Sequence, residues 1–281
     1  MMGRAFRQGL GSRTFVVGLL LTALTLFGVL AGPLISPFSA TEMDFIAVLT
    51  PPDMTHWLGT DSFGRDVLAR VLAGGRISLF VSLCGVGIGA LLGVAAGMSA
   101  AWRGGLYEAG LMAACDLLFA FPSFVLALFM MVVLGFGLQN IVIAIALAYL
   151  PIFARLSRNL TRTLMHEPFV QAARLMGQGG ARILTREILP NIFSTLLVQA
   201  SVGIAFGIVM EAGLSFLGLG VQPPTPSLGV ILADGREYFT RGPWVLTLTG
   251  LVVSVALLGF NLLGDALRDL TDPRLRRAVG E

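Results

Sequence analysis

Hydrophobic residues in this chain gather in six long runs that short polar segments separate. A helix needs about 20 consecutive apolar residues to cross the roughly 30 Å hydrocarbon core of a bilayer. The runs that approach or exceed this length are residues 14–31, 77–101, 111–134, 138–154, 188–210 and 243–264. The pattern therefore predicts an all-α integral membrane protein with six transmembrane helices.

The first run follows three arginines, which is also the layout of a cleaved secretory signal. Arg4, Arg7 and Arg13 precede it, and Pro33 follows it without a small-residue cleavage site. The run is also longer than the apolar region of about 7–15 residues in such signals. We expect it to remain in the protein as a membrane anchor.

The charge pattern predicts the orientation of the chain in the membrane. Only 12% of the 281 residues are charged and 56% are hydrophobic, whereas soluble domains have about 25% charged residues. All basic residues are arginines, and short loops rich in arginine stay in the cytoplasm. With the N-terminus inside, the inner arginines are Arg4, Arg7, Arg13, Arg103, Arg155, Arg158, Arg162, Arg174, Arg182, Arg186, Arg268, Arg274, Arg276 and Arg277. The outer arginines are Arg65, Arg70, Arg76, Arg236 and Arg241. Both termini are thus predicted to be cytoplasmic, and this topology explains the basic charge without a nucleic-acid partner.

Several kinds of chemistry find no support in the sequence. A P-loop requires a lysine that reaches the nucleotide phosphates, and the chain contains no lysine. His56 and His166 fall on opposite sides of the membrane in the predicted topology, which argues against a metal site. Cys84 and Cys115 lie inside apolar runs, so no disulfide framework is expected.

Glycines recur every four residues in the second apolar run, at Gly85, Gly89, Gly93 and Gly97. This spacing places them on one face of a helix, where small residues let a neighbouring helix approach closely. The segment superficially resembles a dinucleotide fingerprint, but no strand precedes it. We therefore interpret these glycines as a helix-packing face.

The outer loop, residues 32–76, contains a short amphipathic pattern. Its apolar face consists of Val67, Leu68, Val71 and Leu72. Asp66 and Arg70 have the i,i+4 spacing of an ion pair, and Gly74 and Gly75 are expected to end the helix. The pattern predicts a helix on the outer membrane surface, serving either as an interfacial support or as a lip of a channel mouth.

The inner loop, residues 155–190, is long for a simple connection between two spans. Pro168 suits the first turn of a helix whose apolar positions follow with helical spacing at Phe169, Ala172, Ala173 and Met176. Gly177 is expected to end this helix, and a second helix is predicted from Ala181 to Leu189, bounded by Pro190. The unit fits a groove on a cytoplasmic partner, or alternatively packs on the spans of its own chain.

The residues of this loop resemble a known family motif. Gln171-Ala172-Ala173, Gly177 and the Glu-Ile-Leu-Pro-Asn of residues 187–191 are similar to the "EAA" loop of bacterial ABC importer permeases. Segments elsewhere resemble the dipeptide, oligopeptide and nickel branch of that family. They are residues 56–66, residues 211–220 with Pro223-Pro224, and residues 261–269 with Asp272-Pro273.

The resemblance implies a type I ABC importer permease in the bacterial inner membrane. Such a subunit would form a channel with a homologous permease, two ATPase subunits and a periplasmic or lipid-anchored binding protein. ATP and Mg²⁺ would be bound by the ATPases, so this chain is expected to have no cofactor and to catalyse no reaction. The implied cargo is a di- or oligopeptide, with nickel as the rival. The residues implied to couple to the ATPases are Phe169, Gln171, Ala172, Ala173, Met176, Gly177, Leu189 and Pro190. The family's motif begins with a glutamate at the position of Gln171. The glutamine replaces a charge-assisted contact to the ATPase with a weaker, neutral hydrogen bond.

Two acidic residues lie in or near the predicted spans, where ionisable groups are costly and often functional. Asp116 is near the inner side and Glu211 is near the outer end of the fifth span; either pairs helices or takes part in gating. A membrane enzyme would need the two carboxylates within reach of one substrate, which this separation argues against. A proton-coupled carrier is the other alternative, although no internal repeat is visible. The expected organisation is an anchor and outer loop (1–75), a permease core (76–266) and a cytoplasmic tail (267–281).

Overall fold

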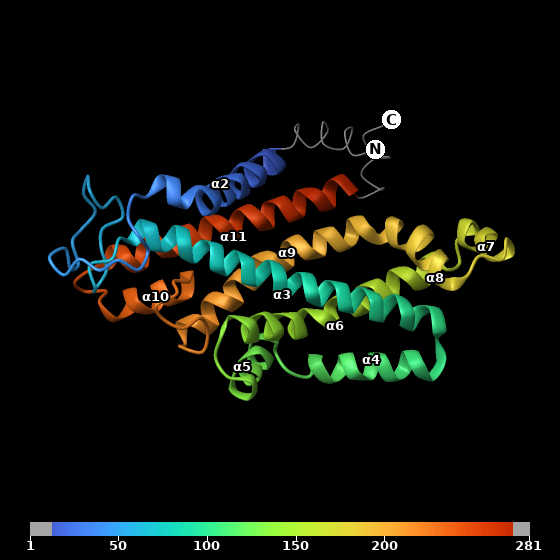
Figure 1. The fold of residues 1–281 in the computed structure, drawn as a ribbon. Coiled ribbons are helices and arrows are strands. Elements are labelled where there is room, and N and C mark those ends of the chain that lie inside the picture. Colours follow the sequence, from blue (N-terminus) through green and yellow to red (C-terminus); the bar gives the residue numbers. More distant parts are fainter. Residues whose placement is uncertain (1–12, 272–281) are drawn as a thin grey trace.

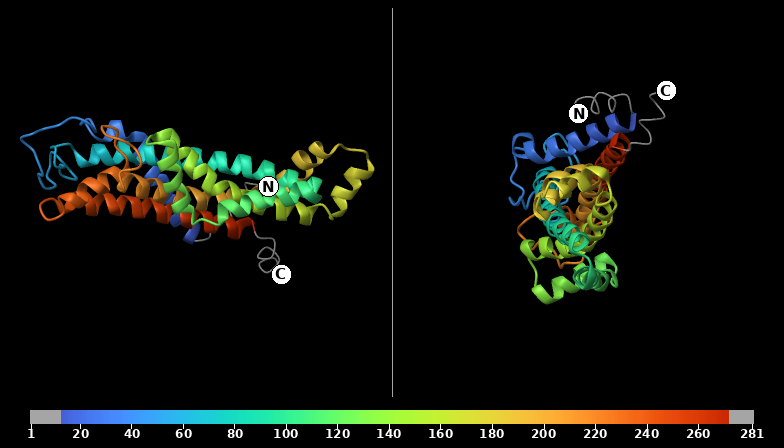
Figure 2. Two further views of the ribbon diagram at one scale, coloured as in Figure 1. Left: turned by 90° about the horizontal axis from the view of Figure 1, so that it is seen from below. Right: turned by 90° about the vertical axis from the view of Figure 1, so that its right-hand side faces the viewer.

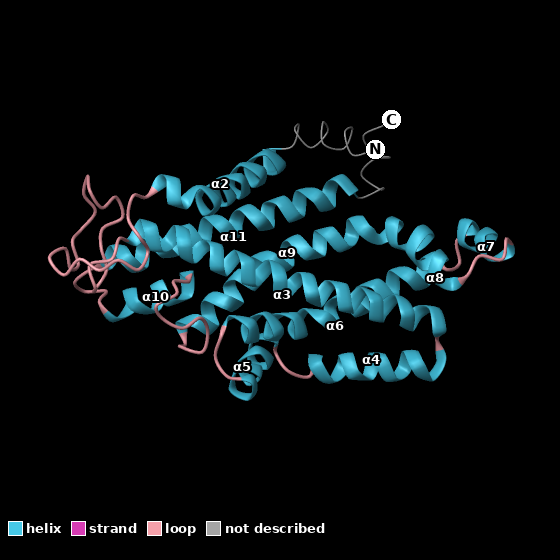
Figure 3. Cartoon of the chain, viewed as in Figure 1, coloured by secondary structure: helices cyan, strands magenta, loops and turns pink. Residues whose placement is uncertain are grey.

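The computed structural model describes residues 13–271, and these residues form helices and loops without a strand (Figure 3). The helices are α2 (Arg13–Ile35), α3 (Val67–Arg103), α4 (Gly105–Phe119), α5 (Ser123–Leu134), α6 (Leu138–Leu164), α7 (Pro168–Leu175), α8 (Gly180–Arg182), the π-helix η1 (Ile183–Ile188), α9 (Leu189–Phe216), α10 (Leu228–Glu237) and α11 (Pro243–Thr271). Arg4, Arg7, Arg274, Arg276, Arg277 and Asp272-Pro273 lie outside the described residues. Most of the predicted tail lies there too, although α11 already extends five residues into it.

The helices form an elongated bundle in which α3, α6, α9 and α11 run along its length (Figures 1 and 2). The helix α7 is at one end, and the loop of residues 36–66 is at the other end, together with α10 (Figure 1). We refer to these as the α7 end and the α10 end. The start of α2 and the end of α11 are both the ends of those helices that lie farther from the α10 end (Figure 1).

Five helical segments of the described chain are long and apolar enough to cross a membrane, in agreement with five of the predicted spans. They are residues 13–32, 67–103, 138–164, 180–216 and 243–266. The third predicted span, residues 111–134, is not one continuous helix. The helices α4 and α5 meet at 88° around Pro122, and the pair forms either a broken span or a re-entrant loop. The apolar run predicted a span here but not the bend, because apolar character alone does not report a bend, whereas proline interrupts helical hydrogen bonding.

The glycine face of α3 packs against α6, as predicted. Gly85, Gly89, Gly93 and Gly97 are all buried. A Cβ atom at Gly89 would lie 3.0 Å from Cβ of Tyr149, and one at Gly97 would overlap the carbonyl oxygen of Ala154. The two backbones therefore touch at a distance that no larger residue permits.

We expect Gly97→Leu to destabilise the protein by about 3 kcal/mol or more, because its side chain has to displace the α6 backbone. Gly87→Leu is the matched control on the same helix, since a Cβ atom there meets nothing within 4 Å. Thermal unfolding of the two variants in detergent measures the difference. Equal melting temperatures would contradict the packing role of the glycine face.

The predicted short helix on the membrane surface does not exist as a separate element. Asp66 is the N-cap of α3, its side chain accepting a hydrogen bond from the N–H of Ala69, and α3 continues through Gly74 and Gly75. Both glycines lie inside the helix because a neighbouring segment approaches there. A Cβ atom at Gly74 would be 2.9 Å from the backbone of Ser227, and one at Gly75 would be 3.0 Å from Val29. The pair Gly74-Gly75 does not end the helix, as its sequence suggests, but permits close packing of neighbouring segments.

Candidate docking surface and charged clusters

The helix α7 forms where the sequence predicts it and is bounded by the residues expected. Pro168 is at its first position, and Gly177 follows its end with φ of +74°, a conformation that glycine adopts without strain. The N–H of Gln178 donates to the carbonyl of Ala173 and that of Gly177 to the carbonyl of Arg174. These two bonds satisfy carbonyls that a helix end leaves free.

The two sides of α7 have different surroundings. Val170 and Ala173 are fully or almost fully buried, in the same apolar cluster as Ile183 and Ile188 of η1. The other side exposes apolar groups: Leu175 is 90% and Met176 71% exposed. We call the exposed side the α7 patch, and it consists of Phe169, Ala172, Leu175 and Met176.

The predicted coupling residues are thus split between two roles in the structure. Ala172 belongs to the α7 patch, whereas Ala173 faces the protein and packs on η1. The prediction that both alanines share one docking face was wrong for Ala173. Ala172 and Ala173 follow Phe169 at i+3 and i+4, so both are near the same apolar face of the helix. Only the position of η1 decides which of the two alanines is covered.

The inner loop is attached to the rest of the bundle by Gln171 and Trp102. Gln171 donates a hydrogen bond of 2.9 Å from its amide to the carbonyl of Met165, so its side chain closes the turn after α6. The guanidinium of Arg174 lies 4.5 Å from the ring centre of Trp102 at the end of α3. Gly180 also packs on this ring, because a Cβ atom there would overlap the indole. These contacts connect the loop to the ends of α3 and α6.

The second helix of the inner loop does not stop at Pro190. The helices α8, η1 and α9 follow one another without a break, and Pro190 lies in the first turn of α9. The N–H of Leu189 bonds to the carbonyl of Leu184, five residues back, so the helix changes from the π to the α pattern next to Pro190, which has no N–H to donate. The boundary predicted at Pro190 was therefore wrong, and a rigid connection joins the α7 region to the fifth span. Leu189 in this connection is half-buried.

A charged cluster lies between α4 and α6 towards the α7 end. Glu108 is buried and is paired with Arg158 at 2.5 Å and with Arg162 at 3.0 Å. Asp116 is paired with Arg155, and both side chains are largely exposed. Asp116 therefore pairs two helices, which is one of the two roles considered for it. Its part in gating stays a prediction.

Glu211 lies at the other end of the bundle and is completely buried. Its carboxylate accepts a hydrogen bond of 2.7 Å from Ser215, whose hydroxyl oxygen accepts from the N–H of Val221 at 3.2 Å. Its other oxygen has no hydrogen-bond partner among the described residues. Glu211 thus connects α9 to the segment that leads into α10. Asp116 and Glu211 have entirely different partners, and the structure does not bring them together.

A buried ion network at the α10 end was not predicted as such. Asp61 of the outer loop pairs with Arg65 at 2.7 Å and with Arg70 of α3. Asp234 of α10 pairs with the same two arginines at 3.3 and 3.0 Å. Asp61 is 1% exposed, so the network joins the outer loop, α3 and α10 inside the protein.

The predicted pair between Asp66 and Arg70 is not formed. Asp66 instead pairs with Nδ1 of His56 at 2.9 Å while it caps α3. The spacing suggested a helical pair because Asp66 was placed inside a helix. No local signal in the sequence indicates that Asp234 pairs with Arg65 and Arg70, since it is far from both arginines in the sequence.

Outside the bundle, hydrogen bonds from the backbone N–H groups of His56 and Thr55 lower the pKa of Asp53.

Residues 13–271 contain no group of three or more His, Cys, Asp or Glu side chains that could bind a metal ion. The structure has apolar spans, the bent pair α4 and α5, and the loop helix α7 with its exposed apolar patch. These features define a class of protein rather than a catalytic centre. The class is the multi-pass membrane permease of the type I ABC importer kind. A solved structure titled "Inward facing conformations of the MetNI methionine ABC transporter" has this fold: the TM-score is 0.57 at 20% identity, and the match covers 72% of this chain and 97% of that chain.

The chain belongs to the family described as binding-protein-dependent transport system inner membrane component, whose model matches residues 89–277. It is a permease subunit of an ATP-driven importer and a multi-pass protein of the inner membrane. A di/tripeptide transport permease of Pseudomonas aeruginosa is 41% identical over 93% of this chain and 88% of that protein. A dipeptide transport permease of Alkalihalophilus pseudofirmus is 36% identical, covering 97% and 90%. A glutathione transport permease of Escherichia coli is 40% identical, covering 86% and 80%.

Proposed function

We propose that this permease imports short peptides, forming the translocation channel together with a homologous permease. The observation behind the cargo is that each relative described above is named for a peptide, glutathione being a tripeptide. Identity near 40% over almost the whole chain supports a shared cargo class. A binding protein outside the membrane would deliver the peptide, in keeping with the description of the family.

The α7 end faces the cytoplasm in this proposal. The exposed arginines of the inner loop, Arg174, Arg182 and Arg186, gather at that end, and the positive-inside rule places such loops in the cytoplasm. The described start of α2 and the described end of α11 are both directed away from the α10 end (Figure 1). Both termini are then cytoplasmic, and the loop of residues 36–66 lies outside.

Separate ATPase subunits supply the energy by docking on the α7 patch. An exposed apolar helix face is what a groove on a partner protein binds. The connection through η1 into α9, with Trp102 on α3, transmits movement of the docked helix to two spans. In this mechanism ATP and Mg²⁺ bind to the ATPases, and the chain itself performs no hydrolysis.

Uptake by the complete transporter in proteoliposomes tests the cargo. We expect ATP-dependent uptake of a labelled dipeptide, with competition by unlabelled di- and tripeptides and none by Ni²⁺ or free methionine at the same concentration. ATP-dependent uptake of labelled Ni²⁺ with no uptake of the dipeptide would replace peptide with nickel as the cargo. Omission of the ATPase subunits is the control, because uptake without them would contradict the division of labour.

A further inference from the structure

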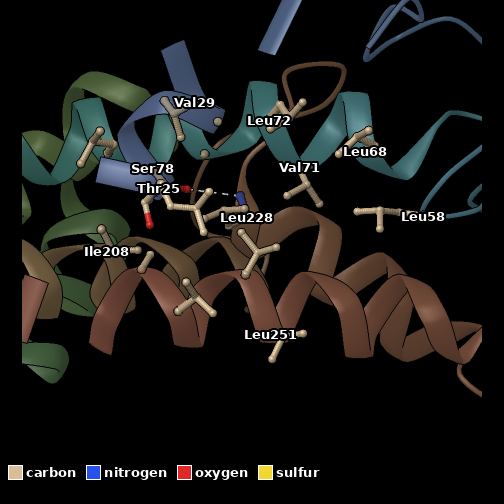
Figure 4. A pocket seen from close by; sticks show the side chains of 17 residues that line it. Thr25, Val29, Leu58, Leu68, Val71, Leu72, Ser78, Ile208, Leu228 and Leu251 are labelled. Atoms are coloured by element: carbon tan, nitrogen blue, oxygen red, sulfur yellow. Dashed lines mark hydrogen bonds between the residues drawn. The ribbon is translucent and has the colours of Figure 1, made fainter. Parts of the chain in front are cut away.

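An apolar cavity of about 290 Å³ lies between α2, α3 and α11 (Figure 4). Its walls are leucine, valine, isoleucine, alanine and glycine, apart from the hydroxyls of Thr25 and Ser78. Thr25 donates to the carbonyl of Leu21 at 2.9 Å, and the hydroxyl oxygen of Ser78 accepts from the N–H of Leu228 at 3.2 Å. Apolar cavities of about 150 Å³ stay dry and take up hydrocarbon ligands. Water is therefore a poor occupant of this larger one.

The cavity opens where two membrane spans separate. The helices α2 and α11 touch at Gly18 and Gly259, where a Cβ atom would be 2.7 Å from Leu263 and 2.8 Å from Thr22 respectively. Farther towards the α10 end the cavity lies between them. Its walls include Leu24 of α2 and Leu251 of α11, which are 61% and 60% exposed. Both helices are long and apolar enough to be membrane spans, so this opening lies at the depth of the membrane.

A cation, Arg76, lies next to the α2 wall of the cavity. Pro33 has no N–H, so the carbonyl of Val29 lacks its usual donor within α2. Arg76 of α3 replaces that donor through Nε, and its guanidinium also donates to the carbonyl of Leu30 at 2.6 Å. Val29 is itself part of the cavity wall. No carboxylate whose side chain is described, among residues 13–32 and 34–266, pairs with Arg76, so its positive charge is uncompensated within that part of the protein.

A second, smaller cavity of about 200 Å³ adjoins Arg76. Ser36, Ser39 and Arg76 contribute polar groups to it, and Leu72 lines both cavities. A dry apolar cavity next to a cationic, hydroxyl-lined one has the two-part chemistry of a phospholipid. The apolar part fits an acyl chain and the polar part fits a phosphate. The helix α2 ends at Ile35, about one and a half turns beyond the carbonyls of Val29 and Leu30 that Arg76 contacts, so Arg76 lies near the outer end of this span, where headgroups lie.

We propose that these two cavities bind one phospholipid with an anionic headgroup. An acyl chain fills the space between α2, α3 and α11, and the phosphate lies against Arg76. The lipid adds to the attachment of α2, which packs on α11 at Gly18 and Gly259 but contacts α3 mainly through Arg76 and the glycines Gly28 and Gly32. This site is separate from the α7 patch and from the charged clusters.

Native mass spectrometry of the assembled transporter in mild detergent tests the site. The probes are phosphatidylglycerol and phosphatidylcholine with identical acyl chains. We expect the wild type to retain one phosphatidylglycerol about fivefold more than phosphatidylcholine, the preference that one arginine near a headgroup provides. Arg76→Gln keeps N–H donors for the α2 carbonyls but removes the charge, so the preference should fall to about one. Arg241→Gln, at an exposed arginine of the same end, should leave it unchanged.

A cavity-filling variant tests the acyl chain. A Cβ atom at Gly28 would meet only Leu72, at an ordinary 3.5 Å, so Gly28→Phe can place its ring in the cavity. We expect retention of both lipids to fall about tenfold, the loss of a well-fitted apolar contact. Ala23→Phe, on the exposed face of the same helix, is the matched control and should retain lipid like the wild type.

Three results would overturn the proposal: no retained lipid in the wild type, equal retention of the two lipids, or equal retention by Gly28→Phe and Ala23→Phe. If Gly28→Phe does not assemble, the wild type is cross-linked with a phosphatidylglycerol that has a photoreactive acyl chain. Cross-links are expected on residues 24–29, 68–79 and 251–256. Cross-links confined to other segments, or detergent or a helix of the second permease in this cavity, would equally overturn it.

Discussion

Ala172→Trp is expected to abolish ATPase association and ATP-dependent uptake while the permease still inserts into the membrane. Ala172 is exposed in the middle of the α7 patch, so a large side chain there cannot disturb the fold but prevents a partner groove from closing on the helix. Losing contact at the centre of an interface costs about 3 kcal/mol, which lowers association about 100-fold. Co-purification of the ATPase subunits and uptake assays measure the effect.

Two further variants separate docking from folding. Ala23→Trp makes the same change on the exposed face of α2 and should leave ATPase association unchanged. Ala173→Trp should instead reduce thermal stability, because Ala173 is 2% exposed and packs in the cluster that contains Ile183. Normal co-purification by Ala172→Trp would show that the ATPases bind elsewhere.

Asp61→Asn is expected to lower the melting temperature of the protein by about 5–10 °C. Arg70 is 2% exposed and its Nε already lacks a partner, so removing the charge of Asp61 leaves a buried guanidinium with Asp234 alone. Breaking a buried ion pair in this way costs about 3 kcal/mol, which corresponds to that temperature change in a protein of this size. Thermal unfolding in detergent gives the value.

The same variant should expose the outer loop to proteases, because Asp61 attaches that loop to α3. Glu42→Gln is the control, since it removes an equal charge from an exposed position in the loop. A melting temperature of Asp61→Asn within about 1 °C of that control would mean that the network contributes little to stability. Asp234 and the helix cap at Asp66 would then be sufficient to attach the outer loop.

The number and order of the membrane spans follow from the sequence because lipid imposes a local requirement. Each span has to satisfy its backbone polar groups internally and expose apolar side chains, and both leave a continuous pattern in the chain. The four-residue spacing of Gly85 to Gly97 is a local pattern of the same kind, and it correctly predicted a packing face. The inner-loop helix starting at Pro168 was predictable for a similar reason, since a proline start and a glycine end are local signals.

The tertiary structure alone decided the features that depend on distant partners. Asp61 and Asp234 share Arg65 and Arg70 although one acid lies in the outer loop and the other in α10, and no periodicity connects such positions. Ala172 and Ala173 are equivalent in the pattern, and η1 determines that only Ala173 is covered. The cavity beside Arg76 exists because α2 and α11 separate beyond a glycine contact. Periodicity reports which face of a helix is apolar, whereas the neighbour that covers that face is set by packing across the whole bundle.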